Sequence, residues 1–238
     1  MTDQSPGTPD RPTRSPPVGP DWGDEAFPRE LHSGRPGMDT LLGKARRGDI
    51  DAVLDALTHD RSLLHAKGFG HNRTLLWEAT RGNRMALVNH LLGSGAPVDV
   101  PGRIRGQIQV LITPYDVARR YGREELARAL LGCGAQIDVF SASFLGERDR
   151  LLELIDREPE LVTREQQDDT VWRVTPLHHA VAGGHDAIVR LLIDRGAKVR
   201  PYTRLLCDIA ARSTRGDLID MLVAEGADPA LADEWGKR

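Results

Sequence analysis

One of the eight histidines of this 238-residue chain, His179, follows closely after Asp168 and Trp172. A histidine with a carboxylate nearby can act as a general base or as a pH-sensitive contact, because its pKa lies close to neutral pH. Catalysis at such a pair also needs a nucleophile or an oxyanion donor, and the surrounding sequence supplies neither. The residues therefore favour a simple binding contact at His179, with His179 and Asp168 as a catalytic pair in the alternative.

A second set of polar side chains lies in the segment 103–112, RIRGQIQVLI. Its polar residues alternate with isoleucine and valine, which is the pattern of a half-buried strand. The polar face of that strand would carry Arg103, Arg105, Gln107 and Gln109. We therefore expect these four side chains to face one common surface.

The remaining histidines and the two cysteines lack the spacing of a metal site. His59, His65 and His71 recur at intervals that suit neither one face of a helix nor a tetrahedral zinc site. Cys133 and Cys207 form neither a disulfide framework nor a Cys-x-x-Cys pair. The sequence also contains no phosphate-binding glycine loop and no G-x-S-x-G motif. We expect no metal and no cofactor.

The overall composition limits the classes of partner. Hydrophobic residues make up 39% of the chain, and no apolar stretch reaches the ~18–20 residues of a transmembrane helix. The net charge is −3, with acidic residues interspersed among the basic ones, which disfavours binding to nucleic acid. The first 37 residues lack the apolar core of a secretory signal. These features predict a cytoplasmic chain that binds neither membranes nor nucleic acid.

The elements that would position the polar side chains are repeated along the sequence. In the clearest unit, 175–199 (TPLHHAVAGGHDAIVRLLIDRGAKV), Thr175 and Pro176 suit the N-cap and first turn of a helix. A glycine pair ends that helix, and a second apolar helix runs to Gly196. Two helices this short cannot hold themselves together, so the unit needs stacked neighbours.

Related units begin at Thr74, Thr113 and Leu205, and more divergent ones begin at Leu41 and Ser141. Equivalent positions in their second helices recur about every 33 residues. This period, together with the motif T-P-L-H-x-A and a closing Gly-Ala pair, resembles the ankyrin repeat family of the bacterial type.

The resemblance implies an all-α ankyrin-repeat solenoid, in which each unit has two antiparallel helices and a short β-hairpin finger. Members of the family mostly bind other proteins through the finger tips and the concave face formed by the first helices, and they have no typical catalytic residues. The resemblance also implies a structural role for His178, the histidine of T-P-L-H. We expect a disordered, proline-rich tail over residues 1–37 and an ankyrin repeat domain over 38–238. Its six expected repeats are 38–73, 74–112, 113–138, 139–174, 175–204 and 205–238.

The spacing between the units is uneven. The finger at 97–112 is long, the finger after Gly134 is nearly absent, and the finger at 162–174 is long again. Two long fingers that flank a missing one predict a notch in the side of the solenoid. Its floor would consist of Ser141, Ser143 and Phe144. The alternative is that the lengths vary without a function, because surface loops tolerate insertions.

Arginines of the first helices would line the concave face beside this notch. Such a row favours a carboxylate-rich or phosphorylated partner, because guanidinium groups bind these anions in bidentate fashion. The alternative is an ordinary solvated face. The expected binding residues are Arg103, Arg105, Gln107, Gln109, Arg119, Arg120, Phe144, Trp172, Arg173 and His179.

The sequence thus predicts a monomeric, non-enzymatic module that binds a protein partner, with an acidic partner favoured. The alternative is a small-ligand binding protein or an atypical enzyme that uses the notch between the fingers at 97–112 and 162–174.

Overall fold

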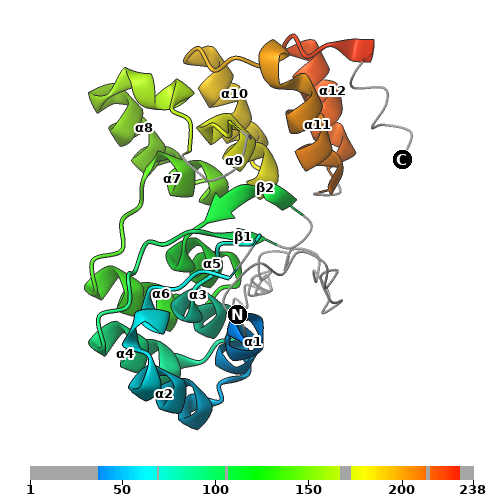
Figure 1. The fold of residues 1–238 in the computed structure, drawn as a ribbon. Helices are drawn as coiled ribbons and strands as arrows, with labels where there is room; N and C mark the ends of the chain where they lie inside the picture. Colours follow the sequence, from blue (N-terminus) through cyan, green and yellow to red (C-terminus); the bar gives the residue numbers. More distant parts are fainter. Residues whose placement is uncertain (1–36, 69, 105–106, 167–172, 213–214, 231–238) are drawn as a thin grey trace, which may run out of the picture.

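The computed structural model describes residues 37–68, 70–104, 107–166, 173–212 and 215–230 (Figure 1). Nearly all of the expected N-terminal tail therefore lies outside the described residues. The same holds for three of the expected site residues, Arg105, Asp168 and Trp172. For Gln107 and Gln109 the backbone is described and the side chain is not.

Twelve α-helices of the described residues follow one another in six pairs, coloured from blue to red in Figure 1. The pairs are α1 (Met38–Arg47) with α2 (Ile50–His59), α3 (Leu75–Arg81) with α4 (Met85–Gly93), α5 (Pro114–Arg120) with α6 (Glu124–Gly132), α7 (Val139–Leu145) with α8 (Arg148–Arg157), α9 (Pro176–Gly183) with α10 (Asp186–Asp194), and α11 (Thr203–Arg212) with α12 (Gly216–Ala224). Short 3-10 turns follow at Arg61–Leu64, Pro159–Thr163 and Arg200–Tyr202. The first helix of each pair packs against the first helix of the next, so the expected all-α solenoid is confirmed.

Four of the first helices begin in the same way. Their N-cap residues are Thr74, Thr113, Asp138 and Thr175. The third helical residue after each cap, here called the N3 residue, falls where the histidine of T-P-L-H stands. The N3 residues of these helices are Trp77, Asp116, Ser141 and His178. Consecutive first helices are packed together, and the N3 residues Asp116 and Ser141 of two neighbouring repeats line the same cavity.

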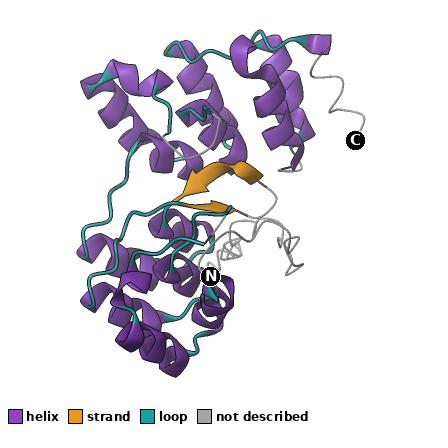
Figure 2. Cartoon of the chain, viewed as in Figure 1, coloured by secondary structure: helices purple, strands orange, loops and turns teal. Residues whose placement is uncertain are grey.

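The long finger at 97–112 forms a hairpin of two antiparallel strands, β1 (Gly102–Ile104) and β2 (Gln107–Ile112), drawn in orange in Figure 2. The prediction of one strand over 103–112 was therefore wrong. A hairpin pairs backbone N–H and C=O groups that a single projecting strand would leave unpaired. As a result, Arg103 lies on one strand and Gln107 lies on the other.

The buried apolar side chains form two clusters. One runs from Met38 to Ala135, and the other contains the apolar side chains from Val139 to Ala227. We call residues 37–135 the N-terminal part and residues 139–230 the C-terminal part. None of the described helices is long and apolar enough to cross a lipid bilayer.

The hairpin belongs to the second cluster, although it precedes α5 in the chain. Ile104, Val110 and Ile112 pack in that cluster, and β2 contacts both α9 and α11. Trp77 of α3 joins them, and its indole Nε1–H donates a hydrogen bond to the carbonyl oxygen of Ile112 at 2.9 Å. Figure 1 shows β2 between the lower helices, α1–α6, and the upper helices, α7–α12. The hairpin therefore lies between the two groups of helices, which residues 133–138 connect in the chain between α6 and α7.

Candidate functional site

A cavity of about 120 Å³ lies between the two long fingers, at the joint between α5 and α7. The first finger, the short link after α6, α7 and the second finger all contribute to it. The lining residues are Asp99, Pro101, Leu111, Thr113, Asp116, Gln136, Asp138, Phe140, Ser141 and Gln166. This cavity occupies the place of the expected notch, and we call it the notch pocket.

Two N3 residues, Asp116 and Ser141, form the buried end of the notch pocket. Their exposed fractions are 2% and 1%. One carboxylate oxygen of Asp116, Oδ2, accepts the backbone N–H of Thr113 at 2.8 Å, which closes a capping box at the start of α5. The Ser141 hydroxyl donates a hydrogen bond to the Asp116 carboxylate, and among the described residues neither Oδ1 of Asp116 nor Oγ of Ser141 has a further partner. At the other end of the pocket, Gln136 and Asp138 are exposed to solvent.

The notch pocket has an acidic lining. Burial raises the pKa of Asp116 to about 7, against the opposing effects of the hydrogen bonds from the Thr113 N–H and from the Ser141 side chain. Burial also raises the pKa of Asp99, and the nearby charge of Asp138 acts in the same direction. No arginine, lysine or histidine is among the described lining residues. Both pKa shifts arise mainly from burial, which disfavours the charged form of each carboxyl in the pocket.

Gln166 links the two fingers across the pocket. Its side-chain Nε2 donates to the carbonyl oxygen of Leu111 at 3.1 Å, which leaves its Oε1 facing Nε2 of His179 at 3.0 Å. Because an amide oxygen can only accept, Nε2 of His179 carries the proton. The fingers are therefore held together by the Gln166 side chain at this point.

His179 lies in the interior of the solenoid, with an exposed fraction of 1%. Its ring packs against Phe140 and Phe144, with centroid distances of 5.1 and 6.5 Å. Burial, with a smaller contribution from His178, lowers the pKa of His179 to about 3, so the ring is neutral at physiological pH. Its Nδ1 has no partner among the described residues.

His178 has the local role that the resemblance implies. Its Nδ1 accepts the backbone N–H of Thr175 at 3.0 Å, which fixes the start of α9. Burial lowers the pKa of His178 to about 3, and the ring is therefore a neutral structural group.

Phe144 and Arg103 are also buried. Phe144 is 1% exposed, and the guanidinium carbon of Arg120 lies 5.1 Å from the centre of its ring. Arg103 is 6% exposed, and its Nε donates to the carbonyl oxygen of Gly70 at 3.0 Å. A partner protein can reach neither Phe144 nor Arg103 without a rearrangement of the solenoid.

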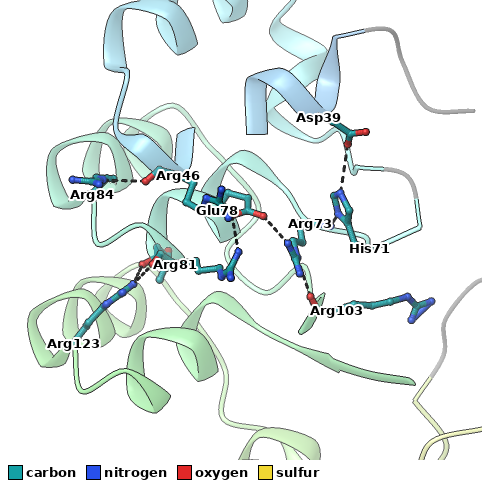
Figure 3. A network of polar contacts seen from close by, with 10 residues as sticks. Asp39, Arg46, His71, Arg73, Glu78, Arg81, Arg84, Arg103 and Arg123 are labelled. Atoms are coloured by element: carbon teal, nitrogen blue, oxygen red, sulfur yellow. Dashed lines mark hydrogen bonds and ion pairs between the residues drawn. The ribbon is translucent and has the colours of Figure 1, made fainter. Parts of the chain in front are cut away.

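Arg103 takes part in the polar network that attaches the hairpin to α3 (Figure 3). Its carbonyl oxygen accepts Nε of Arg73 at 2.8 Å, and Nη1 of Arg73 pairs with Glu78 at 3.0 Å. The guanidinium carbon of Arg73 also lies 4.7 Å from the centre of the Trp77 ring. This network holds β1 against the loop that precedes α3.

Two other arginines of the expected surface, Arg119 and Arg173, form ion pairs within the chain. Arg119 lies 3.0 Å from Glu124 and 3.5 Å from Glu147. Arg173, whose side chain is 76% exposed, lies 3.3 Å from Glu165. These two arginines remain accessible to a partner.

The analysis of spacing did not single out Asp116, Asp99 or Phe140 as site residues. A signal for Asp116 was present, because the third repeat begins T-P-Y-D, with an acid in place of the motif histidine. Among the described residues, no group of three or more His, Cys, Asp or Glu side chains is arranged to hold a metal ion.

Stacked helix pairs with first helices in one row and fingers between them define a helical-repeat solenoid. Residues 139–233, which begin with α7 and contain α8–α12, match the family model of ankyrin repeats in three copies. Residues 139–233 therefore contain ankyrin repeats, as the motifs predicted. Ankyrin repeats generally mediate protein–protein interactions. None of the curated proteins matches the chain.

Proposed function

We propose that the chain is a non-enzymatic module that binds a protein partner through the first-helix face and the two uneven fingers. The observation that carries this proposal is the notch pocket. Its volume of about 120 Å³ is below the ~300–1,000 Å³ of sites that enclose small-molecule ligands. A pocket of this size suits one protruding side chain of a larger partner, which the fingers beside it would contact.

The alternative of a small-ligand protein or an atypical enzyme receives less support. A general base must take up a proton near neutral pH, and the pKa of His179 is about 3. The carboxylate expected beside it, Asp168, lies outside the described residues.

The acidic partner expected from the arginine row would have to replace the ion pairs that these arginines form within the chain. Arg119 and Arg173 are already paired with glutamates, but both pairs are exposed. Exposed pairs are worth only about 0–1 kcal/mol, so a partner's carboxylates can replace them at little cost. We propose these two arginines as contacts for acidic residues of the partner.

We further propose that the chain is a cytoplasmic monomer and that all six helix pairs are ankyrin repeats. The helix pairs before residue 139 support the assignment of six repeats, because two of them begin with a threonine N-cap and all pack in the same series.

Affinity capture from cells of the source organism, followed by cross-linking, tests the binding surface. We expect a captured protein to be lost when Arg119→Glu and Arg173→Glu are combined. The matched control reverses two exposed charges of second helices, Arg128→Glu and Arg190→Glu, and should retain the partner. Equal loss in both double variants, or retention in both, would show that the first-helix face and fingers are not the binding surface.

A further inference from the structure

Several arginines at the turns between first and second helices are held by groups of the chain itself. Arg84 donates to the backbone carbonyl oxygen of Arg46 at 3.0 Å, and Arg215 donates to that of Gly184 at 2.6 Å. Arg119 pairs with two glutamates, at 3.0 and 3.5 Å. Each of these guanidinium groups therefore has an acceptor within the chain.

Arg120, the last residue of α5, has no such acceptor. Among the residues that the structure describes, none accepts a hydrogen bond from its guanidinium group, and no carboxylate forms an ion pair with it. The residue is nevertheless only partly exposed, and burial lowers its pKa. Glu147 in the next turn pairs with Arg119 instead. Arg120 thus carries a positive charge that the described part of the chain does not compensate, and an anion would stabilise it.

An aromatic ring positions this cation. The guanidinium carbon of Arg120 lies 5.1 Å from the centre of the Phe144 ring, within the range of a cation–π contact. Phe144 is 1% exposed and also packs against His179, so its ring is held in the core. A ring contact uses none of the five N–H donors of a guanidinium group. Because Arg120 is already placed, binding of a ligand should cost little side-chain entropy.

The surroundings of Arg120 favour an anion with a single charge. Burial, with smaller contributions from the charges of Arg120 and Arg215, lowers the pKa of His185, so this neighbour adds no second positive charge near pH 7. A carboxylate brings one negative charge to the uncompensated cation, whereas a phosphate ester brings nearly two. The two oxygens of a carboxylate also match two N–H donors on one edge of a guanidinium group.

We propose that Arg120 binds the carboxylate of an aspartate or glutamate side chain of the protein partner. This inference rests on the proposed protein-binding function and adds the residue that anchors one acidic side chain of the partner. Arg119 and Arg173 differ from Arg120, because they must first give up the glutamates with which they are paired.

The first test uses the full chain, labelled with ¹⁵N, and the probe acetyl-Gly-Glu-Gly-amide. Two further peptides replace the glutamate by glutamine, which has the same shape without the charge, and by phosphoserine. Concentrations up to about 0.1 M at constant ionic strength are sufficient to follow weak binding. We expect the glutamate peptide to shift the Arg120 side-chain Nε–H signal saturably. The glutamine peptide should bind about tenfold more weakly or less, and the phosphoserine peptide no more tightly than the glutamate peptide.

The second test removes the charge and keeps the packing. Arg120→Met retains an unbranched side chain over the Phe144 ring, and it should abolish the shift of the Tyr121 backbone amide by the glutamate peptide. The midpoint of thermal unfolding should stay unchanged or rise, because the charge that is lost has no counter-charge. Arg190→Met is the matched control, since Arg190 is an exposed arginine of α10, and it should change neither binding nor the midpoint. Arg120→Gln replaces Arg120→Met if that variant does not fold.

Several results would overturn the inference. These are the absence of a saturable shift at Arg120, equal binding of the glutamine peptide, and undiminished binding of the glutamate peptide by Arg120→Met. A large drop in the unfolding midpoint of Arg120→Met would assign the arginine a structural role. Tighter binding of the phosphoserine peptide would assign the site to a phosphorylated side chain. A captured partner that Arg120→Met still retains would overturn the protein source of the carboxylate.

Failure of this inference differs from failure of the proposed function. If the glutamate peptide does not bind at Arg120, but a captured partner depends on Arg119 and Arg173, only the anchor at Arg120 is lost. If the captured partner depends on Arg120 and is retained after reversal of Arg119 and Arg173, the anchor stands and the wider surface proposed above is wrong.

Discussion

Trp77 in the N-terminal part and His178 in the C-terminal part occupy the same N3 position, yet they are used differently. His178 binds the backbone of Thr175, within its own repeat. Trp77 donates instead to Ile112, in the hairpin that packs on the C-terminal part. The family model matches the region where the motif residue acts locally. The comparison teaches that a divergent motif can mark a long-range contact rather than a lost repeat.

One ion pair from each part shows how much the burial of such pairs varies in the molecule. In the N-terminal part, Arg73 and Glu78 are paired at 3.0 Å with each side chain only 6% exposed. In the C-terminal part, Arg195 and Asp156 are paired at 2.6 Å with side chains 39% and 63% exposed. A buried pair fixes a geometry at a desolvation cost, whereas an exposed pair contributes little.

The largest expected effect comes from breaking the buried pair. Arg73→Met should lower the free energy of unfolding by about 3–5 kcal/mol, because it leaves Glu78 buried with only the more distant Arg81 beside it. Chemical denaturation followed by circular dichroism measures this. The double variant Arg73→Met with Glu78→Met should recover much of the loss. A single-variant cost below about 1 kcal/mol would show that the pair does not hold the N-terminal part.

The next effect is a pH dependence that arises at Asp116. Its pKa rises from the usual 3.8 to about 7 in the folded chain, so the folded state holds a proton that the unfolded state releases. Its contribution to stability is therefore complete below about pH 4 and is lost as the pH rises through 7, by at most about 4 kcal/mol. Thermal unfolding across this range should show a smaller loss in Asp116→Asn than in wild type.

His178 and His179 act in the opposite direction. Their pKa values near 3 mean that stability falls as the pH drops below 6.5, because the unfolded chain then takes up protons that the folded chain excludes. The comparison of wild type with Asp116→Asn removes this shared background. Identical pH profiles for the two proteins would show that Asp116 titrates normally.

A substitution in the repeat at 175–199 probes the apolar stacking of the C-terminal part. Leu192 of α10 is fully buried, and Leu192→Ala should cost about 2–5 kcal/mol in the free energy of unfolding. Urea denaturation gives the value. Leu152→Ala, at a partly buried position of α8, is the control and should cost less. A cost below about 0.5 kcal/mol for Leu192→Ala would contradict the packing of α10.

Two glycines test how closely neighbouring first helices are packed, one in the N-terminal part and one in the C-terminal part. A Cβ atom on Gly82 would lie 1.9 Å from the carbonyl oxygen of Arg46, and one on Gly183 would lie 2.1 Å from that of Phe144. Each glycine thus allows one first helix to approach the backbone of the preceding one. Gly82→Ala and Gly183→Ala should each lower the free energy of unfolding by about 1–3 kcal/mol.

Gly132 in α6 provides the control for these two substitutions. Gly132→Ala places the new methyl group in open space and should change stability by less than either of the other two variants. If Gly82→Ala and Gly132→Ala had equal effects, the N-terminal helices would be stacked less closely than the structure shows.

The smallest effect is expected at the exposed pair. Arg195→Gln should lower the free energy of unfolding by about 1 kcal/mol or less, and less still in high salt. Denaturation at two salt concentrations measures both. A cost as large as that of Arg73→Met would remove the distinction between the buried and the exposed pair.

Much of the fold could be predicted from the sequence, because each helix pair depends on local signals. Threonine caps, glycine stops and the T-P-L-H motif act within one repeat, and finger lengths follow from the spacing. The position of the notch was predictable for the same reason.

The burial of individual site residues could not be predicted, because it depends on contacts between distant segments. Nε of Arg103 donates a hydrogen bond to the carbonyl oxygen of Gly70. His179 is hydrogen-bonded to Gln166, whose amide donates to the carbonyl oxygen of Leu111. An alternating pattern shows that one face of a strand is polar and does not show what covers that face. Asp116 was overlooked because an acid at N3 is also an ordinary capping residue.

The hairpin changes how this array should behave when force or heat is applied. In a linear array each repeat touches only its neighbours, so unfolding can start at one end and proceed repeat by repeat. Here β2 contacts α5, α9 and α11, and Trp77 of α3 packs in the same cluster, so these repeats cannot separate without losing contacts to the hairpin. The repeats that contact the hairpin should therefore be the last to exchange their amide hydrogens with solvent, whereas α1 and α2 can open by themselves.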